Sequence, residues 1–245
     1  MKTKKWMSHG LLLVAMVLAL VGCSKGTGRT LTSATGSVYE CLVVMNDAPL
    51  TQAQLNEVAK LSLINEASGY TKPIASLYDL VEAVMAADMP CMPQVEPYFR
   101  VTKVATAQFD DMFKPTRNIL FVDINPQKYT QLKAKVSNNY WSTPQAICRI
   151  QTPSEEEFVA YWLEHGAEIR EWFVDQEIKR QMKFYRASTN KDARAILQQQ
   201  GYDMLIPEDY MVIMDTVLEG ASTYSLRQPV TVAPEVRLLW CCNNK

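Results

Sequence analysis

The first 23 residues constrain this chain most, because they separate an export signal from the part that can fold. Three lysines lie among the first five residues, and a short apolar run follows over residues 10–22. That run is too short to span a bilayer, which needs about 20 apolar residues, and it has the form of a signal-peptide core. Positions 20–23 read Leu-Val-Gly-Cys, the pattern of a lipobox. The sequence therefore predicts a signal peptide over 1–22 and an exported bacterial lipoprotein.

We expect Cys23 to carry the lipid, with palmitate-type acyl chains on a diacylglyceryl thioether. Each buried methylene contributes about 0.8 kcal/mol, so two or three chains hold a protein on a membrane. The alternative is an ordinary secretory signal with an incidental cysteine at its end. Residues 23–36 are small and polar and contain glycine, which predicts a flexible tether. An acidic cluster after the cysteine is absent, which favours an outer-membrane position facing the periplasm over the cell surface.

The charge of the exported part argues against two kinds of partner. Removal of the signal peptide leaves 223 residues, enough for one large domain or two small ones. It also removes three lysines, which leaves 22 basic and 26 acidic residues and a net charge of about −4. A nucleic-acid partner would require a basic face, and polybasic adhesion to anionic lipid would require a cluster of cations. We therefore expect no nucleic-acid partner and a membrane contact made by the lipid.

Five cysteines remain once Cys23 is acylated, and an export compartment can oxidise them. The number is odd, and Cys41, Cys148 and Cys241 lie in apolar runs, so we expect mostly free, buried thiols. Cys241 and Cys242 are neighbours whose side chains point to opposite faces of a strand, which argues against a disulfide between them. The cysteine spacing fits no metal-binding pattern, and we expect neither a metal nor a cofactor.

Apolar periodicity and turn residues predict an α+β fold with antiparallel strands packed against helices. The elements expected in the first part are a strand over 37–45, helices over 52–66 and 77–89, strands over 98–107 and 118–124, and a helix over 127–135. Those expected in the second part are a strand over 140–150, helices over 155–185 and 191–200, an extended segment over 204–210, and strands over 210–218 and 235–242.

The order strand, helix, helix, proline-marked turn, strand, strand thus occurs twice. It predicts two related α+β halves, 37–136 and 138–245, although α+β domains also repeat such orders by chance. The last strand is apolar, and a helix that could cover it is missing from the remaining residues. We therefore expect the chain to be a C-terminally truncated form of a longer protein.

Short segments downstream of the lipobox are similar to those of a known family. They are Pro93-Gln94-Val95-Glu96-Pro97-Tyr98-Phe99, Arg117-Asn118-Ile119-Leu120, Trp141-Ser142-Thr143-Pro144-Gln145 and Leu205-Ile206-Pro207-Glu208-Asp209-Tyr210. Together they resemble the domain-of-unknown-function 4837 family, a group of Bacteroidetes lipoproteins, over nearly the whole mature chain. The resemblance implies a lipoprotein and supplies neither an activity nor catalytic residues. It also implies that family members continue past the segment matching residues 239–244.

Four residues are candidates for partner binding. Glu96 and Asp209 occupy the two matching proline-marked turns, where turn capping is the alternative role. Trp162 and Trp172 belong to a long helix rich in aromatic residues, and an exposed aromatic patch can bind a glycan or a protein. Packing between helices is the alternative for both tryptophans. His165, the single histidine of the mature chain, has acidic neighbours and fits a surface position.

The residues above favour a lipid-anchored envelope protein that binds a partner or assists envelope assembly without catalysis. Its expected contacts are the membrane, through lipid on Cys23, and an envelope protein or a glycan. The alternative is a carboxylate-dependent enzyme that processes a glycan or peptidoglycan, which would require two acids held at a set separation across a cleft. We assign no catalytic residue.

Overall fold

The computed structural model describes residues 30–65, 72–199, 201–218, 221–227 and 238–244. Residues 1–22, for which a signal peptide is predicted, and Cys23, on which the lipobox prediction falls, lie outside these described residues. Within the described ranges, none of the helices is both long enough and apolar enough to cross a membrane.

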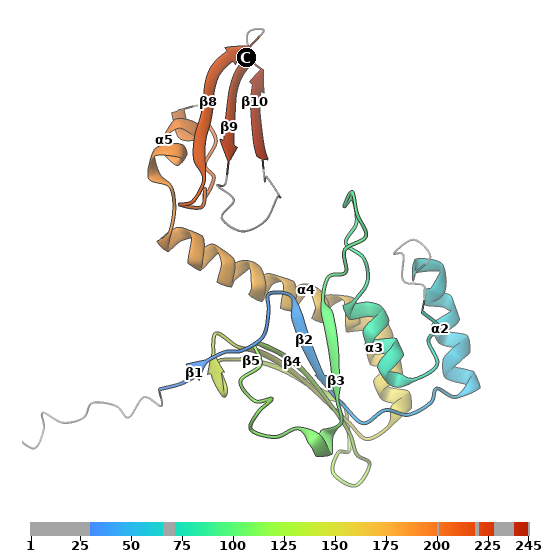
Figure 1. Ribbon diagram of the computed structural model, residues 1–245. Coiled ribbons are helices and arrows are strands. Elements are labelled where there is room, and N and C mark those ends of the chain that lie inside the picture. The colour runs from blue at the N-terminus through green and yellow to red at the C-terminus, as the bar shows by residue number, and fades with distance from the viewer. Residues whose placement is uncertain (1–29, 66–71, 200, 219–220, 228–237, 245) are drawn as a thin grey trace, which may run out of the picture.

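A five-stranded mixed sheet forms the centre of the fold (Figure 1). Its strands are β2 (Glu40–Val44), β3 (Arg100–Val104), β4 (Asn118–Ile124), β5 (Lys133–Asn138) and β7 (Ala146–Thr152). The strand order is β3-β2-β4-β7-β5, and all neighbours are parallel except β5, which runs antiparallel to β7 at one edge. The expected α+β class is confirmed, but this sheet is mostly parallel rather than antiparallel. Helices join β2 to β3, and a parallel pair needs such a long crossover.

Three helices, α2 (Gln52–Asn65), α3 (Leu77–Met85) and α4 (Glu155–Ala187), cover one side of this sheet, which we call the helix face (Figure 1). The largest buried cluster lies between them and the sheet, and it includes Phe99, Phe158 and Phe173. Local capping sets where two of these helices begin. The hydroxyl of Ser76 accepts from the N–H of Asp79 in a capping box, and that of Ser154 accepts from the N–H of Glu157.

Loops cover the opposite side of the sheet, which we call the loop face. Residues 105–117, including the short helix η1 (Thr106–Gln108), place Phe109 and Phe113 against a smaller buried cluster of the strands. Phe121 and Trp141 pack on the same cluster. Next to Trp141, the short strand β6 (Ser142–Thr143) pairs in parallel with β1 (Thr32–Ser33), the first described strand.

The C-terminal part forms a separate antiparallel sheet beyond α4 (Figure 1). Its elements are α5 (Lys191–Gln199), β8 (Met211–Leu218), β9 (Ala221–Arg227) and β10 (Leu238–Asn244). The strand order is β10-β9-β8. Between α4 and this sheet, Ala193 and Leu197 of α5 form a small buried cluster with Ile206.

Two sequence-based expectations differ from these elements. The helix expected over 127–135 is wrong, because β5 begins at Lys133 and pairs with β7 along its whole length. The side chain of Asn125 accepts hydrogen bonds from the N–H groups of Gln127 and Lys128, which makes a turn there instead of a helix. The strand β9 was not expected. The two related halves stay a prediction, although β7 of the second half pairs with β4 and β5 of the first.

The thiols of Cys41 and Cys148 are free and buried in the core of the helix face, as expected. Cys91 is free and exposed on the loop after α3. Cys241 and Cys242 lie on β10, and their side chains are outside the described part of the chain.

Candidate binding site

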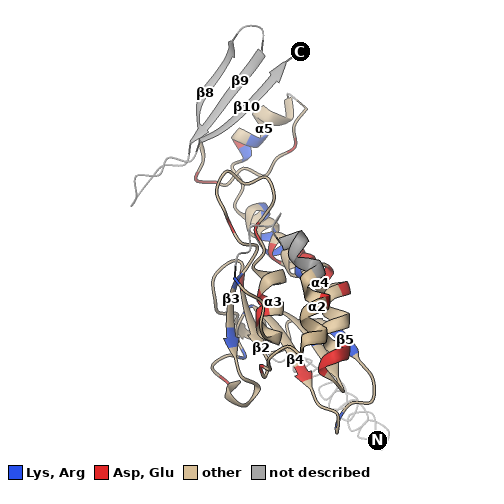
Figure 2. Cartoon of the chain, turned by 90° about the vertical axis from the view of Figure 1, so that its right-hand side faces the viewer, with Lys and Arg blue, Asp and Glu red and all other residues tan. Residues whose placement is uncertain are grey.

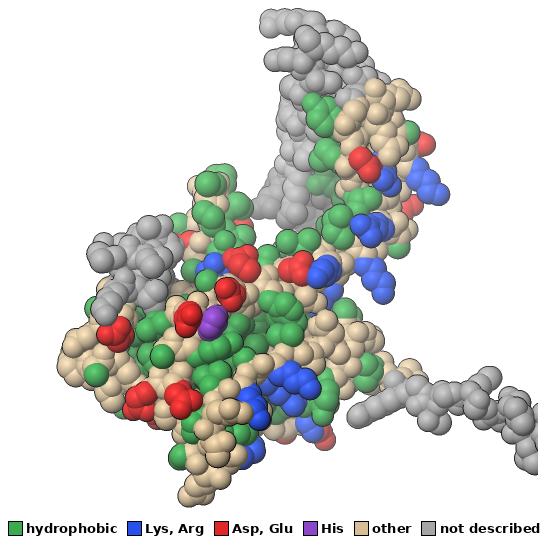
Figure 3. Space-filling model, turned by 180° about the vertical axis from the view of Figure 1, so that it is seen from behind, with side chains coloured by type: hydrophobic (Ala, Val, Ile, Leu, Met, Phe, Trp, Pro, Cys, Tyr) green, Lys and Arg blue, Asp and Glu red, His purple; other side chains and the backbone are tan. Residues whose placement is uncertain are grey.

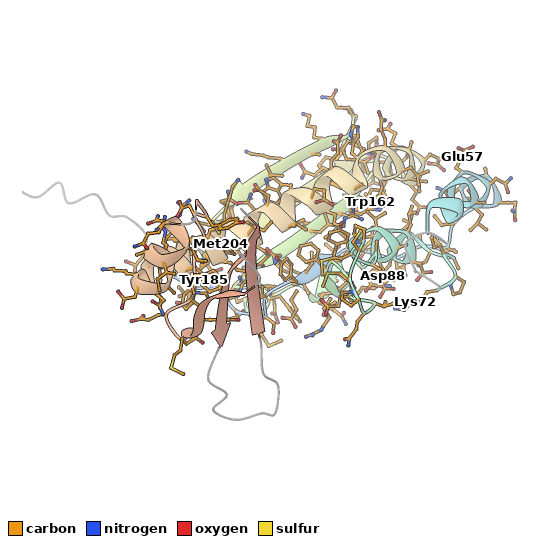
Figure 4. The ribbon with its side chains drawn as sticks, turned by 90° about the horizontal axis from the view of Figure 1, so that it is seen from above. Glu57, Lys72, Asp88, Trp162, Tyr185 and Met204 are labelled. Atoms are coloured by element: carbon orange, nitrogen blue, oxygen red, sulfur yellow. The ribbon has the colours of Figure 1, made fainter. Side chains whose placement is uncertain are left out.

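A cavity of about 530 Å³ lies where α4 ends and the chain returns as a turn over 207–210. It is lined by Phe184, Tyr185, Ser188, Pro207, Glu208, Asp209 and Tyr210. Three of these side chains are aromatic and two are carboxylates. Figure 4 shows Tyr185 at the end of α4 that leads into the C-terminal part, with Trp162 at the opposite end of the helix.

Hydrogen bonds join the two walls of the cavity. The N–H of Glu208 donates to the carbonyl of Ser188 at 3.1 Å, and the Ser188 hydroxyl donates to Glu208 Oε2 at 2.9 Å. Asn190, just before α5, donates through Nδ2 to the carbonyl of Tyr210 at 2.6 Å. The turn that carries the two acids is therefore held against the end of α4 by both backbone and side-chain contacts.

The aromatic wall is open to solvent. Phe184 is 66% exposed, and its ring meets that of Tyr185 edge to face at a centroid distance of 5.6 Å. Glu208 and Asp209 are exposed beside them. Aromatic ring faces attract cations, and carboxylates pair with them, so this combination suits a ligand with a positive charge.

A buried ionic cluster holds α4 to the sheet before the helix reaches the cavity. Glu177 is completely buried and accepts from Arg117 Nε at 3.0 Å and Nη2 at 2.6 Å, and from Asn118 Nδ2 at 2.6 Å. Arg180 Nη1 donates to the same carboxylate at 2.7 Å. Burial lowers the pKa of the Arg180 guanidinium, while the charge of Glu177 opposes that shift. This cluster fixes the helix about two turns before Phe184.

The structure separates the four residues proposed for partner binding. Asp209 lines the cavity, whereas Glu96 lies exposed on the loop after α3, where its carbonyl accepts from the N–H of Met89. Trp162 is completely buried and donates through Nε1 to the carbonyl of Leu80 at 3.2 Å, so it belongs to the core and presents no binding surface. Trp172 is partly buried against the same core, as the packing alternative expects.

Phe184 and Tyr185, two of the three aromatic residues that line the cavity, were not predicted from the sequence to bind a partner. They follow the last core residue of α4, Phe173, by three turns, and they come just before the helix ends. Their position beyond the buried stripe is the signal that could have separated them from the core tryptophans.

His165 lies on the outer surface of α4, where its ring packs on Tyr161 at a centroid distance of 4.6 Å. Its Nδ1 lies 3.2 Å from Glu168 Oε2. Figure 3 shows acidic side chains on both sides of the histidine. The described residues hold no group of three or more His, Cys, Asp or Glu side chains that could bind a metal ion.

These features define a mixed α+β protein with an aromatic, acidic cavity at the end of its longest helix. A family model described as a domain of unknown function (DUF8532) matches residues 57–186. The match spans just over half of the chain, so the protein belongs to this family. No curated protein and no solved structure gives a match.

The family match corrects the earlier resemblance. The domain-of-unknown-function 4837 assignment is wrong, because the matching family is a different one. That assignment rested on four short segments, two of which, residues 93–99 and 205–210, lie outside the helices and strands of the fold. The matched region includes Phe184 and Tyr185 but ends before the turn over 207–210, so only one wall of the cavity lies within it.

Proposed function

We propose that this protein is a lipid-anchored envelope module that binds a partner protein through the cavity at the end of α4. Lipid on Cys23 holds it on the membrane, on the periplasmic side of the outer membrane. The partner presents a lysine or arginine side chain to the cavity. The observation that supports this is one cavity with two carboxylates and three aromatic rings, of which Phe184 is largely exposed.

The energetics of such a site fit a protein partner. Aromatic side chains dominate the binding energy of protein interfaces, and a desolvated cation over a ring contributes about 2 kcal/mol. Phe184 supplies an apolar surface that is already exposed, while Glu208 and Asp209 supply charge complementarity. Because the cavity lies at a helix end fixed by buried ion pairs, it needs little ordering on binding.

The anchor is tested by mass spectrometry of the protein extracted from bacterial membranes. We expect the mature chain to begin at Cys23 with a diacylglyceryl group on its sulfur. The Cys23→Ser variant should lose this modification. An unmodified cysteine in membrane-extracted protein would contradict the proposed anchoring.

The binding site is tested by photocrosslinking in intact envelopes. A benzoylphenylalanine placed at position 184 should crosslink one defined envelope protein, and the Glu208→Gln/Asp209→Asn variant should lose that product. The matched control carries the same crosslinker at Met182, which lies on α4 with 38% exposure but does not line the cavity. Equal products at both positions, or capture of a glycan in place of a protein, would overturn the proposal.

A further inference from the structure

Three cations share the loop face near the edge of the sheet. Lys135 pairs directly with Arg149 in the register of β5 and β7, and Lys133 pairs with Gln151 one step along. Cross-strand partners project from the same side of a sheet, and like charges placed opposite each other are destabilising. Figure 2 shows the basic residues on β5, at the sheet edge. Within the described chain, none of the three cations forms an ion pair.

Two acids, one on β4 and one on the loop that covers this face, already have cationic partners. Asp123 on β4 accepts from Lys128 Nζ at 2.8 Å and from the Tyr129 hydroxyl. On the loop that covers this face, Asp111 pairs with Lys114 at 2.5 Å. The charge of Lys133, Lys135 and Arg149 is therefore not offset by either acid, although the whole mature chain is acidic.

Aromatic side chains surround one of these cations, Arg149. The guanidinium carbon of Arg149 lies 4.9 Å from the ring centre of Tyr140, 5.1 Å from that of Trp141 and 5.9 Å from that of Phe121. Tyr140 is 52% exposed, and Met112 on the covering loop is 72% exposed. Tyrosine and tryptophan beside basic residues are the side chains that favour a membrane–water interface.

The proposed tether enters the fold at this same place. Thr32 of β1 pairs with Ser142 of β6, the residue after Trp141. Eight residues lie between Cys23 and Thr32, and a fully extended chain over these nine steps spans roughly 30 Å. Lipid on Cys23 would therefore keep the loop face within a short distance of the bilayer.

We propose that the loop face docks on an anionic phospholipid surface, with Tyr140 and Trp141 at the interface and Lys133, Lys135 and Arg149 on lipid phosphates. This inference rests on the proposed lipid anchor, which supplies the membrane. The acidic net charge of the chain did not favour such contact, but the cations lie together where the tether begins. Each basic residue near an anionic bilayer adds electrostatic attraction, and the aromatic side chains favour insertion at the level of the lipid headgroups. The helix face, with acidic side chains around His165 in Figure 3, then points away from the membrane.

Tryptophan quenching by brominated lipid tests this orientation. The lipidated full-length protein is reconstituted into vesicles of brominated phosphatidylcholine, with or without phosphatidylglycerol. We expect stronger quenching with phosphatidylglycerol, and the Trp141→Phe variant should lose most of that increase. Equal quenching in both vesicles, or an increase that survives the Trp141→Phe change, would overturn the proposal.

A charge variant tests the same surface without changing its packing. Lys133→Gln/Lys135→Gln alters two exposed lysines and should abolish the phosphatidylglycerol-dependent quenching. The matched control, Lys183→Gln/Lys191→Gln, removes two exposed lysines from α4 and α5 and should retain it. If both variants lose the effect equally, overall charge is responsible and the docking surface is refuted.

The two proposals fail in different measurements. An unmodified Cys23 in the mass spectrum removes the anchor, whatever the loop face does. If the protein is lipidated but shows no quenching in either vesicle, the proposed anchor stands and the proposed docking is refuted. The three cations would then be available to an acidic protein partner.

Discussion

Arg117 and Glu177 form a bidentate ion pair, with Nη2 and Oε2 2.6 Å apart across 60 residues of sequence. Arg117 precedes β4, and Glu177 lies in the second half of α4, beyond the part of the helix that packs most closely on the sheet. This contact therefore decides the direction in which α4 leaves the body of the protein. A buried carboxylate needs all its partners, so the pair also makes the helix sensitive to single substitutions.

We expect Glu177→Gln to lower the free energy of unfolding by about 3 kcal/mol, because it leaves the two partly buried guanidinium groups of Arg117 and Arg180 without a counter-charge. Chemical denaturation measures the change. Glu168→Gln is the control, since that carboxylate lies on the same helix with 79% of its side chain exposed, and it should have almost no effect. Similar losses for both substitutions would contradict the role given to the buried cluster.

We expect Gly166→Ala to destabilise the protein by about 1 kcal/mol, although alanine is the better helix former. A methyl group at this position would lie 3.0 Å from Trp162 Cε2, and that ring is completely buried and hydrogen bonded. Thermal unfolding of a double-mutant cycle measures it. In the Trp162→Phe background the smaller ring should relieve the clash, so an unchanged cost there would refute this explanation.

Asp47 should contribute stability that depends on pH. Burial alone would raise the pKa of its carboxyl, but hydrogen bonds from Lys103, at 2.5 Å, and from the N–H of Tyr78 lower the pKa below its ordinary value. The contribution is therefore present above the unfolded-chain pKa of about 3.9 and is lost as the pH falls through the lower folded pKa.

Asp47→Asn should accordingly cost about 1 kcal/mol at neutral pH, and the difference from the parent should vanish in strong acid. Urea unfolding across a pH series measures this. Asp111→Asn serves as the control, because that carboxylate is 93% exposed and its removal should leave stability unchanged. A difference that persists at low pH would show that Asp47 acts by packing instead of charge.

The thiols of Cys41 and Cys148 should resist alkylation in the folded protein. Burial raises the pKa of Cys148 to about 12 and raises that of Cys41 as well, so neither forms the reactive thiolate at neutral pH. Iodoacetamide labelling read by peptide mass spectrometry should modify the exposed Cys91 at least about a hundredfold faster. Denaturant should abolish the difference, and rapid labelling of Cys148 without it would contradict the burial.

Local chemistry explains which elements the sequence predicts well. The starts of α3 and α4 follow from serine caps at Ser76 and Ser154, whose partners lie three residues away. Strand direction depends on contacts between distant segments, so the parallel pairing of β2 with β3 could not be read from either strand. The residues of β5 have no strong strand pattern of their own, and their pairing with β7 overrides that local preference.

Of the residues that line the cavity, only Asp209 was proposed from the sequence, as a candidate for partner binding. Asp209 could be proposed because its turn contains a proline and acidic residues, and such a pattern can be recognised from neighbouring residues alone. Phe184 and Tyr185 are more than twenty residues away from Asp209 in the sequence. One backbone and one side-chain hydrogen bond between Ser188 and Glu208 hold the two segments together. The tryptophans were proposed as an exposed aromatic patch because they are large and lie on one helix. The position of Trp162 on α4, however, places its side chain in the buried core.

The uninterrupted length of α4 has a mechanical consequence. Its 33 residues form a rod of about 50 Å, and each residue advances the far end by about 100° around the axis. One extra residue inserted between Arg180 and Phe184 would leave the sheet and the ion pairs of Glu177 intact while rotating the aromatic wall about the helix axis by more than a quarter turn. The number of residues in α4 therefore determines the direction in which the cavity at its C-terminal end faces, relative to the sheet.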